Sequence, residues 1–80
     1  KFHLFPNPAQ DRVRIVYSGD LLPEGNRITI HNSFGQLVHT KSFTVKTIEL
    51  DIQSLHEGVY YIRVNGQPSS VKLIKSSRLY

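Results

Sequence analysis

Apolar and polar residues alternate along most of this 80-residue chain. Such alternation gives a β-strand one buried and one solvated face, and no long stretch carries the three-to-four spacing of an amphipathic helix. The sequence therefore predicts an all-β fold. Six strands are expected at residues 12–17, 27–31, 37–43, 47–52, 59–64 and 71–75, with a seventh, shorter strand at residues 2–5.

Turn-forming residues separate the predicted strands. The linker at residues 32–36 suits a type I turn closed by a glycine bulge, which would place Ile30 opposite Val38 in a hairpin. An Asn-Gly pair at residues 65–66 is the strongest short hairpin signal in the chain. Pro68 has no N–H to donate to a ladder, so we expect that loop to be longer than two residues.

Short strands separated by turns at this frequency are typical of a β-sandwich. Residues 55–60 add the L-x-x-G-x-Y pattern of a tyrosine corner, in which the Tyr60 hydroxyl bonds to backbone a few residues upstream. We therefore expect an immunoglobulin-like Greek-key β-sandwich of six or seven short antiparallel strands. Its predicted core contains Val13, Ile15, Ile28, Ile30, Val38, Leu50, Tyr60, Ile62 and Val64.

The composition, with 39% hydrophobic and 20% charged residues, favours a folded chain. A chain of this length holds one core, so residues 1–80 are expected to be a single domain, cut from a longer protein. Cysteine is absent, so packing alone must stabilise the fold. No apolar stretch approaches the roughly 20 residues that span a bilayer, so membrane insertion is not expected. The formal charge of +4 is scattered and lacks an aromatic cluster, which argues against nucleic acid as a partner.

Candidate chemistry is sparse. In the predicted hairpin His31 and His39 share a face, but two histidines without a convergent carboxylate fall short of a zinc site. Glu49 and Asp51 lie on a solvated strand face, where no apolar pocket could raise the pKa of one acid. The chain also lacks a G-x-S-x-G elbow and a glycine-rich phosphate loop. We therefore expect no metal, no cofactor and no enzymatic activity.

Four sequence motifs carry a family resemblance. An aromatic residue precedes P-N-P-A and a V-x-I strand at residues 5–15, and two aliphatic strands flank a turn with Gly35 at residues 28–38. Residues 50–64 read L-D-I-Q-S-L-H-E-G-V-Y followed by a strand with a basic residue, and residues 71–75 form a basic and apolar strand. In this order they resemble the C-terminal sorting domains of the type IX secretion system of certain Gram-negative bacteria, the Por secretion system type A family.

Two features depart from the family pattern. His31 and Asn32 stand where the family more often has an Asp near the turn, which would change the cap of that turn but not its direction. Residues 76–80 extend past the usual lysine-rich end, so the recognised terminus is either Lys75 or Tyr80.

The resemblance implies a C-terminal signal that directs its parent protein across the outer membrane. Such a domain folds in the periplasm, is bound by the outer-membrane translocon and shuttle components, and is removed by a sortase-like peptidase. The parent then stays at the outer membrane surface or becomes extracellular. The signal is expected to be recognised as a folded shape with an available terminal strand, because strand addition at an open edge supplies backbone hydrogen bonds. An open edge would also permit self-association.

The site residues implied by the resemblance fall into four groups. Each also has a structural alternative: the proline-rich turn and the glycines can serve the backbone alone, and outward-facing Lys72 and Lys75 can simply solvate an edge strand. The groups are the family-motif turn (Pro6, Asn7, Pro8, Asp11), the turn glycines (Gly35, Gly58), the tyrosine corner (Tyr60) and the terminal strand recognised by the translocon (Val71, Lys72, Leu73, Ile74, Lys75).

A different class of function stays open at this point. An immunoglobulin-like adhesive or carbohydrate-binding accessory module would have the same strand pattern, and so would a spacer between domains. An adhesive module would bind a ligand saturably and could lie anywhere in its parent, whereas a sorting domain must be last.

Overall fold

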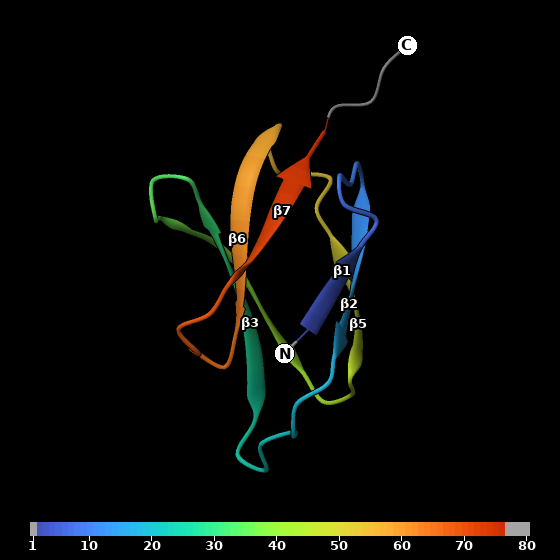
Figure 1. Ribbon diagram of the computed structural model, residues 1–80, viewed down its shortest axis with the longest axis vertical. Coiled ribbons are helices and arrows are strands. Elements are labelled where there is room, and N and C mark those ends of the chain that lie inside the picture. Colours follow the sequence, from blue (N-terminus) through green and yellow to red (C-terminus); the bar gives the residue numbers. More distant parts are fainter. Residues whose placement is uncertain (1, 77–80) are drawn as a thin grey trace.

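A computed structural model of the chain describes residues 2–76 and shows two packed β-sheets (Figure 1). Within these residues every strand pair is antiparallel, and no helix is present that could cross a membrane. The expected all-β, immunoglobulin-like Greek-key sandwich is confirmed. Its strands are β1 (Phe2–Phe5), β2 (Arg12–Tyr17), β3 (Asn26–Asn32), β4 (Leu37–Phe43), β5 (Thr47–Asp51), β6 (Gly58–Val64) and β7 (Val71–Lys75).

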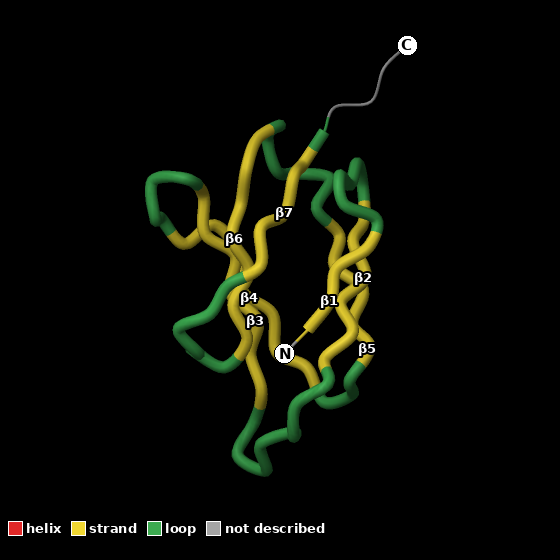
Figure 2. The backbone as a smooth tube through the Cα atoms, viewed as in Figure 1, coloured by secondary structure: helices red, strands yellow, loops and turns green. Residues whose placement is uncertain are grey.

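The strands are not paired in simple chain order. One sheet has the order β1-β2-β5 and the other β4-β3-β6-β7, so the chain crosses between the layers after β2, β4 and β5 (Figure 2). β1 and β7 are edge strands of different sheets and contact each other on one side of the sandwich. The segment that follows β1 is therefore placed where it can reach β7.

The core lies between the sheets and is built from alternate residues of each strand. Burial alternates along β2 and β6, as the hydrophobic pattern predicts. Every predicted core residue is buried except Val38. The buried hydrophobic side chains are Phe2, Ala9, Val13, Ile15, Tyr17, Ile28, Ile30, Phe43, Ile48, Leu50, Ile52, Tyr60, Ile62, Val64 and Leu73.

The β3–β4 hairpin differs from the expected register. Next to the turn the pairing agrees with the expectation, because His31 lies opposite Leu37. The register then shifts, so that Val38 has no partner and Ile30 pairs with His39. This one-residue bulge makes the predicted Ile30–Val38 pair wrong and leaves Val38 39% exposed instead of in the core.

The β6–β7 connection is longer than a two-residue turn, as Pro68 predicted. It occupies residues 65–70, with Asn65 and Gly66 both at positive φ. Asn65 extends the pairing of β6 with β3, since its N–H donates to Arg27 O at 2.8 Å and its Oδ1 accepts from Arg27 N at 2.8 Å.

Candidate functional site at the edge of the terminal strand

The site suggested by the sequence centres on β7, an edge strand of the four-stranded sheet. Residues Val71, Leu73 and Lys75 alternate with Lys72 and Ile74 along it, and the pairing with β6 sets Tyr60 opposite Leu73. In an antiparallel ladder every second residue turns its N–H and C=O away from its neighbour. On β7 these are Lys72, Ile74 and the following Ser76, and their backbone groups point to the outer edge.

That outer edge is covered by the segment after β1. The Asn7 side chain donates from Nδ2 to Lys72 O at 2.8 Å and accepts at Oδ1 from Ile74 N at 2.9 Å. Ala9 N then donates to Ile74 O at 2.9 Å, and Ser76 N donates to Ala9 O at 2.9 Å. These four bonds cover the edge of β7 from Lys72 O to Ser76 N. We call residues 6–9 the edge cover; Figure 1 shows this chain turn, in dark blue, following β1.

The P-N-P-A sequence explains this arrangement. Pro6 and Pro8 have no backbone N–H, so the chain around Asn7 cannot form a regular ladder with β7. The Asn7 carboxamide carries one acceptor oxygen and an NH₂ donor, and it therefore replaces the missing peptide group. The Phe5–Pro6 and Asn7–Pro8 peptide bonds are both cis. Ala9 is only 1% exposed and pairs with Lys75 in a short parallel bridge.

The expectation of an available terminal strand is therefore not met over the stretch from Lys72 to Ser76. The alternation in β7 correctly places the strand at a sheet edge, but the donors and acceptors of that edge are already used by Asn7 and Ala9. Asp11, the last residue of the predicted motif turn, is half-buried and its carbonyl accepts from Ile52 N at 2.9 Å. The motif turn thus joins β7 on one side to the end of β5 on the other.

The two lysines of β7 lie in different environments. Lys72 is exposed on the outer side of the sheet, as expected. Lys75 was expected to face outward, but it is only 7% exposed, because odd-numbered residues of β7 face the core. Its Nζ donates to Gln10 O, directly after the edge cover. The aliphatic stem of Lys75 therefore packs inside while its charged end reaches a carbonyl.

The glycines and the tyrosine corner lie on neighbouring elements. Gly35, at φ 84°, closes the β3–β4 turn, where its N–H donates to Asn32 O at 3.0 Å. Gly58, at φ 153°, begins β6 and pairs with Lys75. The Tyr60 hydroxyl donates to His56 O at 2.6 Å, which is the bond expected of a tyrosine corner. The third and fourth motifs therefore meet at one end of the four-stranded sheet.

Asn32 supplies the cap of the β3–β4 turn. Its Oδ1 accepts from Phe34 N and from Gln36 N, each at 3.0 Å, so an amide serves where the family more often has a carboxylate. The bulge at Val38 also separates His31 from His39, since His39 now pairs with Ile30 while His31 faces outward. Within residues 2–76 no group of three or more His, Cys, Asp or Glu side chains is arranged to hold a metal ion.

The bonds between the edge cover and β7 were not predicted from the sequence. The signal was present, because Asn between two prolines is a side chain with no regular backbone partner nearby. What it bonds to, 65 and 67 residues away, cannot be inferred from local pattern.

Comparison with known proteins agrees with the four motifs. The secretion system C-terminal sorting domain family matches residues 3–76. Beta-agarase A of Zobellia galactanivorans is 36% identical over 72 residues, which is 89% of this chain and 12% of that protein. Domains of this family interact with the type IX secretion machinery and are cleaved, and the proteins they sort pass to the outer membrane surface or are secreted. The resemblance is confirmed: the chain belongs to the secretion system C-terminal sorting domain family and is a C-terminal signal for type IX secretion.

Proposed function

We propose that the chain is the sorting unit of a larger exported protein and that the translocon binds β7 with the edge cover in place. The observation that carries this proposal is the set of four hydrogen bonds from Asn7 and Ala9 to β7. They join the first family motif to the last one. The two motifs therefore form one composite edge, which we define as residues 6–9 together with β7.

The edge cover determines which groups of β7 a partner can bind. Strand addition needs free N–H and C=O groups, and between Lys72 and Ser76 these are already bonded. A partner that binds the folded domain instead contacts side chains of the composite edge. Exposed Asn7, Pro8, Lys72 and Ile74 are available for that contact. The same covering disfavours self-association through β7.

The remaining steps follow from this role. The domain folds in the periplasm, where the absence of cysteine makes folding independent of oxidation. Shuttle components and the outer-membrane translocon then recognise the composite edge, and a sortase-like peptidase cuts ahead of the domain at the cell surface. The domain itself acts as a signal and catalyses no reaction.

The test is a reporter protein fused ahead of residue 1 and expressed in a bacterium with a type IX system. The unchanged fusion should reach the surface, and Asn7→Ala should reduce surface delivery and leave the fusion in the periplasm. Arg12→Ala is the matched control, because it lies exposed on the other sheet. Equal delivery of both variants would contradict the proposal. Saturable sugar binding by a domain that does not direct export would support the adhesive alternative.

A disulfide between the edge cover and β7 distinguishes two mechanisms. In one the partner binds the covered edge, and in the other the cover must leave β7 before the partner binds. Ala9 and Lys75 are bridge partners, so cysteines at both positions lie within disulfide reach. The proposal predicts that Ala9→Cys/Lys75→Cys is exported as well as each single variant, with the cover held on β7. If both single variants are exported and the double variant stays in the periplasm, the cover must leave β7 and strand addition is the correct mechanism.

A further inference from the structure

The outer surface of the four-stranded sheet has an unusual charge distribution. The strands β3, β4, β6 and β7 contain no Asp or Glu, while their charged residues are all basic. The other sheet is mixed: Arg14 forms an ion pair with Glu49, and Arg12 lies opposite Asp51. The four-stranded sheet therefore presents positive charge that its own strands do not neutralise.

Basic and apolar side chains lie together on this surface. His31 of β3, Tyr61 of β6 and Lys72 of β7 follow one another across the sheet in register. Val59 pairs with Ile74 in the neighbouring row. Val59, Tyr61 and Ile74 are 36%, 38% and 38% exposed, so they form an apolar strip beside the cations. We define the basic face as His31, Val59, Tyr61, Arg63, Lys72 and Ile74.

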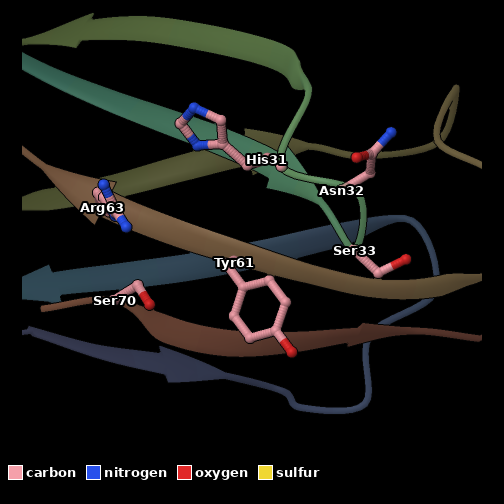
Figure 3. A pocket seen from close by; sticks show the side chains of 7 residues that line it. His31, Asn32, Ser33, Tyr61, Arg63 and Ser70 are labelled. Carbon is pink, nitrogen blue, oxygen red and sulfur yellow. The ribbon is translucent and has the colours of Figure 1, made fainter.

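A shallow cavity lies in the basic face. It has a volume of about 370 Å³, and its lining includes His31 and Ser33 from β3 and its turn, Tyr61 and Arg63 from β6, and Ser70 ahead of β7. Figure 3 shows these side chains around the same stretch of β6. Within residues 2–76 the side chains of His31, Tyr61 and Arg63 have no hydrogen bond or ion pair of their own. Their donors are free to bind an acidic group that enters the cavity.

The lining of the cavity carries hydrogen-bond donors that suit an anionic group. The Arg63 guanidinium presents a planar fork of donors that matches a carboxylate. Hydroxyls of Ser33 and Ser70 and the ring of His31 add further hydrogen-bonding groups to the lining. An Asp or Glu side chain therefore fits this cavity.

We propose that the basic face docks on an acidic surface of a protein component of the export machinery. An Asp or Glu of that partner enters the cavity beside Arg63 and His31, and apolar side chains of the partner cover Val59 and Ile74. This inference rests on the proposed function, because it presumes that export is directed through contact with the folded domain. It adds the partner's chemistry and extends the contact surface from Lys72 and Ile74, which also belong to the composite edge, across β6 to His31 of β3.

A protein surface fits the basic face better than a lipid surface does. Apolar side chains with Tyr and Arg among them are the composition of a protein interface centre. Each cation near an anionic bilayer contributes only about 1 kcal/mol, and the basic face has two residues that are always cationic, Arg63 and Lys72. The apolar strip lies on strands rather than on a projecting loop that could enter a bilayer.

The first experiment reverses charge in the reporter fusion. Arg63→Glu should lower surface delivery by about tenfold or more, because it sets like charges against each other at the interface. Arg12→Glu on the other sheet is the matched control and should deliver normally. Both purified domains must keep the unchanged domain's urea midpoint. If Arg63→Glu does not fold, Arg63→Gln with His31→Gln removes the guanidinium fork with its charge and the imidazole ring without adding an acid, and it should also reduce delivery.

The second experiment identifies the contacted molecule. A photoreactive benzoylphenylalanine replaces Tyr61 in the fusion in living cells, and exposed Thr47 on β5 of the other sheet is replaced as the control. Crosslinks at position 61 to an Asp- and Glu-rich segment of one export component, lost with Arg63→Glu, would support the inference. Crosslinks to lipid or glycan, or none above the level at position 47, would overturn it. So would Arg63-dependent binding of the purified domain to phosphatidylglycerol vesicles.

The outcomes separate this inference from the proposed function. If the unchanged fusion fails to reach the surface, or Asn7→Ala has no effect, the proposed function fails. If the unchanged fusion reaches the surface, Asn7→Ala is retained and Arg63→Glu is delivered like Arg12→Glu, only the docking role of the basic face fails.

Discussion

The two edges of the four-stranded sheet are protected in different ways. On β4 every side chain from Leu37 to Ser42 is exposed, and the strand carries its own protection: a bulge at Val38 and the polar residues His39 and Lys41 at core-facing register positions. Lys41 Nζ also donates to Glu49 O of β5 at 3.0 Å. Bulges and inward-pointing charges are recognised means of preventing edge-to-edge pairing.

The β7 edge instead depends on a distant segment. Asn7 and Ala9 use its outer donors and acceptors, and Leu73 on its inner side is completely buried. Substitutions within β4 are thus expected to weaken the protection of the β4 edge. Substitutions in the edge cover, far away in the sequence, are expected to weaken the protection of the β7 edge. The motif near the start of the domain and the strand near its end therefore form one structural unit.

The largest expected effect separates a buried apolar side chain of β7 from an exposed apolar side chain of β4. Leu73→Ala should lower the free energy of unfolding by about 2–5 kcal/mol, because it leaves a cavity in the core. Val38→Ala on β4 should cost less than about 0.5 kcal/mol, as expected for an exposed position. Urea denaturation of both variants measures this difference. Equal losses would show that β4 and β7 are equally part of the core.

Loss of the edge cover's hydrogen bonds should lower the free energy of unfolding by less than Leu73→Ala does. Asn7→Ala removes two exposed hydrogen bonds and should lower the free energy of unfolding by about 1–2 kcal/mol. Asn7→Asp should cost at least as much, because it has no NH₂ donor for Lys72 O and brings a carboxylate against that carbonyl. Thr40→Ala on the open β4 edge is the control and should be nearly neutral. Urea midpoints that are the same for Asn7→Ala and Thr40→Ala would refute the role of the cover.

The tyrosine corner should have a slightly smaller effect. Tyr60→Phe removes the hydrogen bond to His56 O and should lower the free energy of unfolding by about 0.5–1.5 kcal/mol. The neighbouring Tyr61→Phe should change it little, because within residues 2–76 the Tyr61 hydroxyl has no partner. Thermal unfolding of the pair gives the comparison. A Tyr60→Phe domain as stable as Tyr61→Phe would mean that the corner bond contributes nothing.

The smallest effect on stability is expected at the β4 edge. His39→Val with Lys41→Val should change the free energy of unfolding by no more than about 0.5 kcal/mol, since both positions are exposed. It should nevertheless make the domain associate with rising concentration, because the edge loses its charge. Sedimentation velocity measures this association, with Thr40→Val as the control. A monomer at every concentration would show that the bulge alone protects β4.

Periodicity predicted the fold because it reflects burial directly. Alternation placed β2, β6 and β7, and turn residues located the ends of the β3–β4 hairpin. The bulge at Val38 escaped prediction, because an inserted residue changes which side chains face the core without altering the apolar content. Beyond the turn, the predicted inward and outward positions of β4 are therefore off by one residue.

The candidate site was predicted in its parts and missed as a whole. Pro6, Asn7 and Pro8 were singled out by motif, and β7 by composition and position. Their contact depends on β1 and β7 lying side by side in different sheets, which is a property of the tertiary fold. Lys75 was misplaced for a different reason: its charge suggested solvent, although the alternation that buries Leu73 also turns Lys75 to the core, where its Nζ donates to Gln10 O.

Amide hydrogen exchange followed by NMR tests the difference between the two edges most directly. Arg27 bonds Asn65 on the β6 side of β3, so alternate residues of β3 bond β4, and Thr40 and Ser42 turn their amides to the open edge. We predict slow exchange at Ile74 and Ser76, fast exchange at Thr40 and Ser42, and faster exchange at Ile74 in Asn7→Ala. Exchange at Ile74 as fast as at Thr40 in the unchanged domain would contradict the covered edge.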